Sequence, residues 1–213
     1  ALFEKTVEAL KAKGAVVEEV SLREDLLKAI LPAYYLIANC EATANHSNLD
    51  GIRFGVQQPG SSMEEIMIQS RTKGFGSLIR KRFVIGSYGL FVENQEKLFR
   101  QAQRVRRLIV ENVAEVMKDY DILIAPASSD VAPKLDDHSR DELSDGYLIA
   151  ENHMVIGNFT GYPSCTVPMG LIEGLPVGLN MTAKAWDEQS LFDFAAAMED
   201  ITGLKDATAE GIE

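Results

Sequence analysis

The residues best suited to acid–base or nucleophilic chemistry in this chain are few, and they do not form a catalytic pattern. The histidines are His46, His138 and His153, and no serine or cysteine motif lies in step with them. An enzyme that cleaves amides needs an activated nucleophile, a base that takes its proton, and donors that stabilise the oxyanion. No G-x-S-x-G motif occurs, so the sequence offers no nucleophile elbow. We therefore predict no catalytic residue in this chain.

The serines offer only weak alternatives. One S-x-x-K match joins Ser70 to Lys73, but neither S-D-N nor K-T-G accompanies it, so chance explains it best. Ser62 precedes Glu65 by three positions, which is the spacing of a helix capping box. The pair at residues 128–129 leads from a predicted strand into an acidic loop. We expect structural roles for these serines.

Composition excludes several classes of protein. The 213 residues include 32 acidic and 21 basic ones, and the net charge of -11 disfavours a general affinity for nucleic acid. Cys40 and Cys165 lie far apart in the sequence, which predicts neither a disulfide framework nor a metal site and fits a reducing cytosol. No apolar run approaches the roughly 18 residues that span a bilayer. We expect a cytoplasmic protein with no metal and no membrane partner.

Hydrophobic periodicity predicts alternating helices and strands, and therefore the α/β class. The predicted helices cover residues 2–13, 25–39 with a break or kink at Pro32, 63–71, a run after Gly76, 95–117, 150–159 and 187–201. The predicted strands cover residues 15–20, 121–126, 165–169 and 177–181, and the second of these has the form of a strand buried on both faces. In the helix after Gly76, we expect Leu78, Ile79, Phe83 and Val84 to face inward. We expect a single domain over residues 1–213.

Glycines and prolines between residues 161 and 181 form the most specific pattern in the chain. Residues 161–170 read G-Y-P-S-C-T-V-P-M-G, and residues 174–181 read G-L-P-V-G-L-N-M. Proline cannot donate to a β-ladder, so it belongs at the end or edge of a strand. The pattern resembles the C-terminal signature of the amidase signature family, G-x-P-x-x-x-V-P-x-G followed by G-L-P-V-G-L. The alternative is an ordinary antiparallel pair that ends an α/β domain.

This resemblance implies a mixed β-sheet covered by helices, and it explains the missing nucleophile. Amidase signature enzymes use a serine, a second serine preceded by a cis peptide, and a lysine, all in a Gly/Ser-rich region of their N-terminal half. No such region occurs here. The resemblance therefore implies that residues 1–213 are a C-terminal fragment, and that the catalytic part lies upstream of Ala1.

Further motifs narrow the resemblance to the A subunits of glutamyl-tRNA(Gln) amidotransferases. Residues 34–42 (Y-Y-L-I-A-N-C-E-A) and 48–55 (N-L-D-G-I-R-F-G) resemble the Y-Y-x-I-A-x-x-E-A and D-G-x-R-Y-G segments of these subunits. Residues 71–82 contain R-T-K-G-F-G and R-K-R, which are similar to R-S-E-G-F-G and K-R-R. Two segments depart from the pattern: residues 86–94 lack an expected G-Y-Y-D-A-Y-Y run, and residues 126–129 replace P-T-A-P-T.

Carried over residue by residue, the resemblance implies that Tyr34, Arg82 and Glu151 bind the substrate glutamine. A guanidinium can hold an α-carboxylate through two hydrogen bonds, and an acidic side chain can pair with the α-ammonium group. Glu151 stands where the family usually has aspartate. The alternative interpretations are a core tyrosine, a surface arginine and an acid on a helix face.

The resemblance also implies the function and partners of the whole subunit. It hydrolyses glutamine and passes ammonia to a partner that amidates glutamyl-tRNA(Gln) with ATP and magnesium, so we expect the B and C subunits as partners, tRNA contact through the partner, and no cofactor in this chain. The chain alone is expected to be inactive. The alternatives are part of a stand-alone amidase for another small amide, or a non-catalytic interaction module. We also expect the isolated fragment to form a homo-oligomer through an unpaired strand edge and uncovered apolar residues at 122–125 and 166–169.

Overall fold

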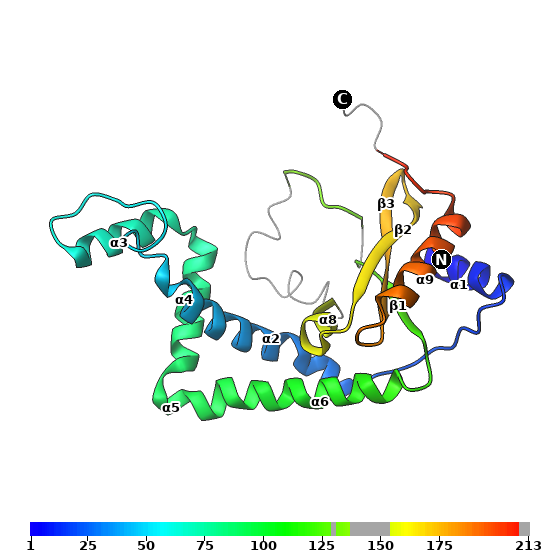
Figure 1. Cartoon of the computed structure of the whole chain (residues 1–213), viewed down its shortest axis with the longest axis horizontal. Coiled ribbons are helices and arrows are strands. Elements are labelled where there is room, and N and C mark those ends of the chain that lie inside the picture. The colour runs from blue at the N-terminus through cyan, green and yellow to red at the C-terminus, as the bar shows by residue number, and fades with distance from the viewer. Residues whose placement is uncertain (129–130, 137–153, 209–213) are drawn as a thin grey trace. The chain divides into compact units, whose positions relative to one another are not determined.

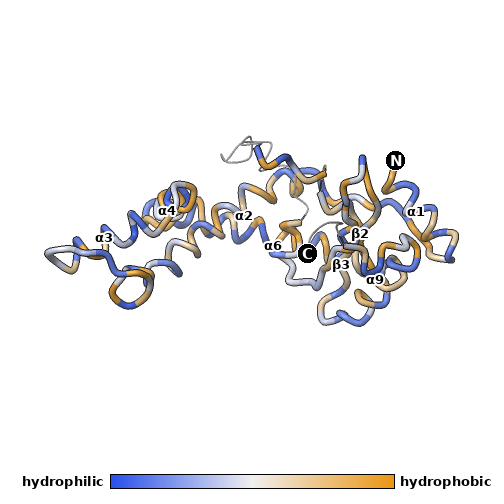
Figure 2. The backbone as a smooth tube through the Cα atoms, turned by 90° about the horizontal axis from the view of Figure 1, so that it is seen from above, coloured by the Kyte–Doolittle hydropathy of each residue, from blue (hydrophilic) through white to orange (hydrophobic). Residues whose placement is uncertain are grey.

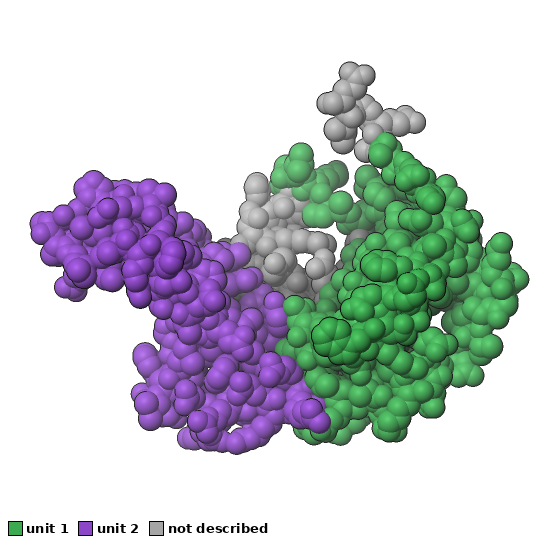
Figure 3. Space-filling model, in the orientation of Figure 1, with its two compact units in different colours: residues 1–30, 108–213 green, residues 31–107 purple. Residues whose placement is uncertain are grey.

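The computed structural model describes residues 1–128, 131–136 and 154–208 (Figure 1). The chain forms two compact units, which Figure 3 distinguishes by colour. The first unit consists of Ala1–Ile30 and Leu108–Glu213, and the second consists of Leu31–Arg107. The described residues combine helices with a small antiparallel sheet, which confirms the α/β class.

The first unit is built on a three-stranded sheet. Its strands are β1 (Ile122–Pro126), β2 (Ser164–Ile172) and β3 (Leu175–Ala183), which lie in the order β1-β3-β2 with both pairs antiparallel. The two strands predicted from the glycine and proline pattern are β2 and β3, so that prediction is confirmed. The register of β2 shifts between Pro168 and Gly170, and a bulge accommodates a proline because one residue there leaves the ladder.

Helices α1 (Leu2–Ala12) and α9 (Glu188–Thr202) pack against this sheet, and the unit also contains the short helix α8 (Val155–Thr160). The buried cluster contains Leu10 of α1, Leu191 and Met198 of α9, and the strand residues Val167, Met169, Leu179, Met181 and Ala183. We expected residues 166–169 to be uncovered, and this is wrong for Val167 and Met169. Side chains alternate between the faces of a strand, so of these four residues Thr166 and Pro168 are exposed and the other two are buried.

Two predicted strands differ from expectation. Residues 15–20 form no strand, because a strand needs a ladder partner and no described strand lies beside them. Tyr120 does link to this segment, since its hydroxyl donates a 2.7 Å hydrogen bond to the Glu18 carboxylate. Strand β1 was expected to be buried on both faces. Among the described strands it lies at the edge of the sheet and pairs only with β3, and its residues are half-buried or exposed.

Helices and one long loop make up the second unit and its connections. The helices are α2 (Glu24–Asn45), the 3-10 turn η1 (His46–Asn48), α3 (Met63–Gly74), α4 (Ser77–Leu90), α5 (Val92–Gln95), the π-helical turn η2 (Glu96–Arg100) and α6 (Gln101–Val116). Helix α2 runs through Pro32 without a break, so of the expected break or kink only the kink stays a prediction. The helix predicted over 95–117 begins earlier and contains η2, which interrupts its 3.6-residue period. None of the described helices is long and apolar enough to cross a bilayer.

Glycines allow α2 and α4 to touch. A Cβ atom at Gly86 would lie 2.1 Å from the Asn39 carbonyl oxygen, and one at Gly89 would lie 2.7 Å from the Cys40 sulfur. Both distances are shorter than any van der Waals contact, so only glycine fits. The Cys40 thiol, which is fully buried, donates a 3.5 Å hydrogen bond to the Gly86 carbonyl. This close approach fixes how the two helices present their side chains to each other.

The outer face of α4 differs from the sequence prediction. Leu78 and Phe83 are half-buried, but Ile79 and Val84 are exposed, and Val84 exposes 71% of its surface. Hydrophobic residues recur along α4 in Figure 2. Hydrophobic periodicity identifies the apolar face of a helix, but it does not show which segment packs against that face. Among the described residues, nothing covers Val84.

Candidate substrate-binding site

Three of the residues that could hold an amino-acid substrate lie together in the second unit. The guanidinium carbon of Arg82, on α4, lies 5.6 Å from the centre of the Tyr35 ring, on α2. The rings of Tyr34 and Tyr35 meet edge to face, with centroids 6.0 Å apart. A guanidinium over an aromatic face gains cation–π attraction and is held in one orientation. The structure thus brings Arg82 to the tyrosine pair, with Tyr35 as its direct neighbour.

Two donor atoms at this place have no acceptor among the described residues. They are Nε of Arg82 and Nδ2 of Asn39, and both atoms are buried. Asn39 lies one helical turn after Tyr35 on α2 and exposes only 3% of its surface. A carboxylate can bind the side of a guanidinium through Nε and one terminal nitrogen. Nε of Arg82 is therefore a donor for which a carboxylate would be a suitable acceptor.

Polar contacts hold the loop between η1 and α3 in place. The Asp50 carboxylate, 2% exposed, accepts hydrogen bonds from the backbone nitrogens of Ile52 and Arg53, each at 2.9 Å. It also accepts a 2.9 Å bond from Nε of Arg53. The backbone N–H of Arg53 is the largest of several causes that lower the pKa of Asp50 to about 2. These contacts give the D-G-x-R motif a structural role as a closed turn.

Arg71 anchors the same loop to the helices that carry the candidate site. Its Nη1 donates to the carbonyl oxygens of His46 (2.7 Å) and Leu49 (3.1 Å). Its guanidinium carbon also lies 5.0 Å from the Phe75 ring centre and 5.4 Å from that of Phe83. Arg71, which lies on α3, thereby links η1 and the residue that follows it to α4.

His46 and Ser70, two residues considered for catalysis, have structural partners. Nδ1 of His46 lies 2.8 Å from the Ala42 carbonyl oxygen, and the ring packs beside Phe83. Ser70 Oγ accepts a 2.9 Å bond from the Gln58 backbone nitrogen, while Lys73 donates to the Gln58 side chain. The S-x-x-K pair therefore shows no hydrogen bond between its own members in the described part of the chain.

The cap predicted for α3 is confirmed. Ser62 Oγ accepts a 3.2 Å bond from the Glu65 backbone nitrogen. The Glu65 carboxylate reaches back to the backbone nitrogen and hydroxyl of Ser61, and these bonds lower its pKa. The reciprocal contact of the capping box thus falls one residue earlier than the sequence spacing predicts. Both serines serve the start of the helix.

Some predicted residues lie outside the described part of the chain. They are Glu151, His138 and His153, so the position of Glu151 stays a prediction. Among the residues that the structure describes, no group of three or more histidine, cysteine, aspartate or glutamate side chains could hold a metal ion.

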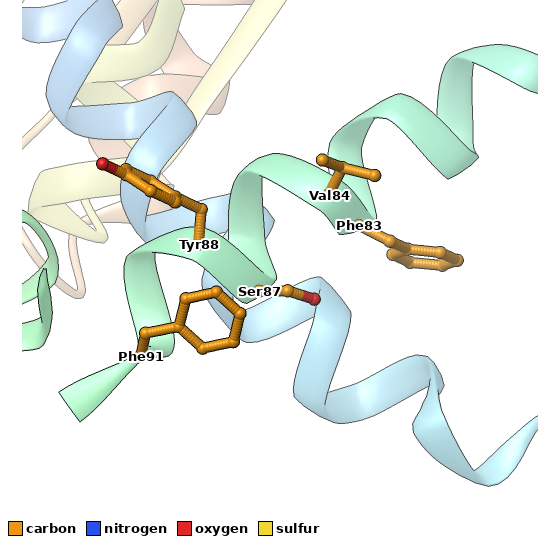
Figure 4. A pocket seen from close by; sticks show the side chains of 5 residues that line it. All are labelled: Phe83, Val84, Ser87, Tyr88 and Phe91. Carbon is orange, nitrogen blue, oxygen red and sulfur yellow. The ribbon is translucent and has the colours of Figure 1, made fainter. Parts of the chain in front are cut away.

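A separate apolar depression lies on α4. Its volume is about 310 Å³, and it is lined by Phe83, Val84, Ser87, Tyr88 and Phe91 (Figure 4). The first four lie on successive turns of α4, and Phe91 follows the end of the helix. Neither Tyr34 nor Arg82 lines it. Its mainly apolar side chains suit an apolar group better than glutamine.

Sequence reasoning missed Tyr35 as the ring beside Arg82, and it missed Asn39 as a buried residue where α2 meets α4. Tyr35 had a visible signal, because it is the second member of the tyrosine pair. Asn39 had none, because the burial of its amide depends on the close approach of α4 at Gly86.

The family model named Amidase matches residues 1–192. The A subunit of the glutamyl-tRNA(Gln) amidotransferase of Lactobacillus delbrueckii subsp. bulgaricus is 35% identical over 214 aligned positions, which cover 99% of this chain and 43% of that protein. The same protein of an Exiguobacterium species is 37% identical over 94% of this chain and 41% of its own length. The chain thus spans less than half the length of these curated relatives.

Solved structures share the fold. The crystal structure of the glutamyl-tRNA(Gln) amidotransferase A subunit from Thermotoga maritima matches with a TM-score of 0.66 and 28% identity, over 94% of this chain and 38% of that one. A crystal structure of an amidase matches with a TM-score of 0.72 over 95% of this chain and 41% of that one. Its identity of 21% supports the likeness of fold alone.

Proposed function

The chain belongs to the amidase family, and from that premise we propose that it forms the glutamine-binding part of a glutamyl-tRNA(Gln) amidotransferase A subunit. In this role the subunit hydrolyses the side-chain amide of glutamine: the C–N bond breaks, water supplies the oxygen and hydrogens, and glutamate and ammonia leave. The identity of 35% to a protein of that name, over nearly the whole chain, supports this subgroup.

The observation that carries the proposal is the setting of Arg82. Its guanidinium lies over the Tyr35 ring, and its buried Nε has no acceptor among the described residues. A surface arginine would leave Nε in water, and a structural arginine would pair it with a protein oxygen. An arginine that is held by an aromatic ring with Nε kept available is suited to the α-carboxylate of an amino acid. Tyr34 and Glu151 complete the proposed pocket, Glu151 by pairing with the α-ammonium group.

The proposal divides the work between this chain and its partners. The serine, serine and lysine that perform the hydrolysis belong to the part of the relatives that this chain does not span. Ammonia then passes to the B subunit, which uses ATP and magnesium to amidate glutamyl-tRNA(Gln), with the small C subunit as the third partner. This chain contributes no cofactor ligand and acts in the cytoplasm. Its net charge of -11 is consistent with leaving tRNA contact to the B subunit.

The test is the effect of Arg82→Lys on the KM for glutamine. The enzyme for this test joins the chain to the segment that precedes the matching region in its relatives. Lysine keeps the charge but loses the planar pair of donors, so we expect a loss of about 1 to 3 kcal/mol in binding. Arg80→Lys is the matched control, because Arg80 is an exposed arginine on the same helix. A KM for Arg82→Lys within about twofold of the unmodified enzyme would mean that Arg82 does not bind the substrate and has only a structural role.

Two further measurements separate this function from its alternatives. The purified chain alone should release no ammonia from glutamine above a heat-killed control, because no nucleophile and base pair is predicted in it. Co-purification with a B and a C subunit separates the amidotransferase from a stand-alone amidase. Activity of the joined enzyme on another small amide, without those partners, would favour the stand-alone amidase. Absence of any amidase activity in the joined enzyme would favour an interaction module.

A further inference from the structure

One side of helix α2 contacts helix α4 in the second unit. Tyr35, Asn39 and Thr43 follow one another at intervals of four residues, so they share a side of the helix. Each meets α4: Arg82 lies over the Tyr35 ring, the backbone of Asn39 touches Gly86, and the Thr43 hydroxyl lies 3.4 Å from the Phe83 carbonyl oxygen. Asn39 is therefore enclosed between Tyr35 on one side and the helix contact on the other.

The side chain of Asn39 is unusual in this position. It is 3% exposed, yet its Nδ2 finds no acceptor in the part of the chain that the structure describes. Arg82 Nε, on the facing helix, shares this condition. Buried N–H groups are nearly always paired, since an unpaired one loses its hydrogen bonds to water without replacement. Two such donors on facing helices call for an acceptor that the described residues do not supply.

We infer that Asn39 is a second substrate-binding residue, whose Nδ2 donates to the same carboxylate as Arg82. This inference rests on the proposed glutamine pocket. A carboxylate accepts hydrogen bonds through two oxygens and donates none, so it can satisfy a guanidinium and a carboxamide together. Arg82 alone would bind one edge of the carboxylate, and a donor from α2 would add a hydrogen bond from a second direction. Asn39 would thus set the orientation of the substrate and favour α-amino acids over amides without a carboxylate.

A rotated Asn39 amide gives the competing arrangement. Oδ1 would then accept from Arg82 Nε, and Asn39 would only position that arginine. Two variants separate the arrangements. If Nδ2 binds the ligand, Asn39→Asp places a second negative charge against the carboxylate and weakens binding more than Asn39→Leu does. If Oδ1 holds Arg82, Asn39→Asp keeps that contact and binds the ligand better than Asn39→Leu.

The experiment follows the side-chain N–H signals of Asn39 and Arg82 by ¹⁵N NMR in the whole chain. Asn39→Leu and Arg82→Lys assign these signals by deleting them. The probes are L-glutamine, glutaramate, which lacks the α-amine, and 4-aminobutanamide, which lacks the carboxylate. We expect both signals to shift together with glutamine and glutaramate, and neither to shift with 4-aminobutanamide. Asn39→Leu should raise the dissociation constant about tenfold. The matched control Asn45→Leu, at an exposed position of the same helix, should change it by less than about twofold.

Each outcome bears on a separate claim. A shift of the Arg82 signal without the Asn39 signal overturns this inference and leaves the proposed function standing. Milder loss in Asn39→Asp than in Asn39→Leu also overturns it, in favour of the positioning arrangement. Shifts of both signals with glutaramate, in a joined enzyme that fails to hydrolyse glutamine, support the carboxylate site and remove the proposed function. No shift of either signal with any probe overturns both.

Discussion

The first unit buries a large apolar cluster between the sheet and helices α1 and α9, whereas the second unit buries few apolar residues, namely Ala33, Ile37, Cys40 and Ala102. Val84, Tyr88, Phe91 and Val92 of the second unit are exposed. Its interior also includes the polar residues Asn39, Asp50 and Ser70. The first unit is thus organised by a hydrophobic core, and the second by polar contacts and a close helix approach that set the geometry of the candidate site.

The largest expected effect tests the core of the first unit. Met181 is fully buried in the cluster, so Met181→Ala should lower the free energy of unfolding by about 2 to 5 kcal/mol. Val92 exposes 91% of its surface, so Val92→Ala should change it by less than about 0.5 kcal/mol. Urea denaturation of both variants measures these changes. A similar loss in Val92→Ala would break the comparison, because it would mean that the face around Val92 is covered in solution.

A smaller effect tests the helix approach of the second unit. Gly86→Ala should cost about 1 to 3 kcal/mol, because the new methyl group would meet the Asn39 carbonyl oxygen, a backbone atom that cannot move alone. Gly74→Ala is the matched control, because a Cβ at Gly74 meets no atom within 4 Å. That variant should be neutral or slightly stabilising, since alanine is the better helix former. Equal stability of the two variants in thermal melts would show that α2 and α4 do not rely on this contact.

The smallest expected effect is the dependence of the second unit on pH. The pKa of Asp50 falls from 3.8 to about 2 on folding. A lowered pKa stabilises the folded state above the unfolded value, so this contribution is full above pH 3.8 and is lost as the pH falls toward about 2. Asp50→Asn should be less stable near neutral pH and should lose this part of the acid dependence. Asp25, Glu65 and Glu96 also have lowered pKa values.

The measurement is therefore the difference between Asp50→Asn and the unmodified chain, from about pH 5 to about pH 2. Subtraction removes the contribution of the other carboxylates. Amide hydrogen exchange should place the lost protection in the loop around Asp50, and protection of β3 should be unchanged. A constant difference across this range would show that the buried carboxylate does not control the acid response.

Features set by local sequence could be predicted, whereas strand pairing and burial that depend on tertiary contacts could not. Strands β2 and β3 were predictable because the prolines and glycines between residues 161 and 181 mark strand ends and turns. The Ser62 cap was predictable for the same local reason. The strand expected at residues 15–20 failed because pairing depends on a distant partner. The exposure of Val84 and the burial of Asn39 could not be read from the sequence, because both depend on which segment packs against α4.

In the candidate site, the motifs identified Arg82 and the tyrosine pair, which the structure brings together. The choice of Tyr34 within that pair stays a prediction, as does Glu151. The two tyrosines differ by one position, which turns a side chain by about 100° around a helix. A motif match places the pair, but only the packing of α4 shows which ring lies beside the guanidinium.

The two thiols provide a reporter for each unit. Cys40 is sealed beneath the contact of α2 with α4 in the second unit, and Cys165 lies half-buried on β2 in the first. Burial raises the pKa of both thiols, so each reacts slowly with alkylating reagents until its surroundings open. When the structure around a cysteine recloses faster than the thiol is alkylated, the labelling rate of that cysteine gives the free energy of the local unfolding that exposes it. Mass spectrometry of the two peptides can therefore follow the two units separately in a single unmodified chain.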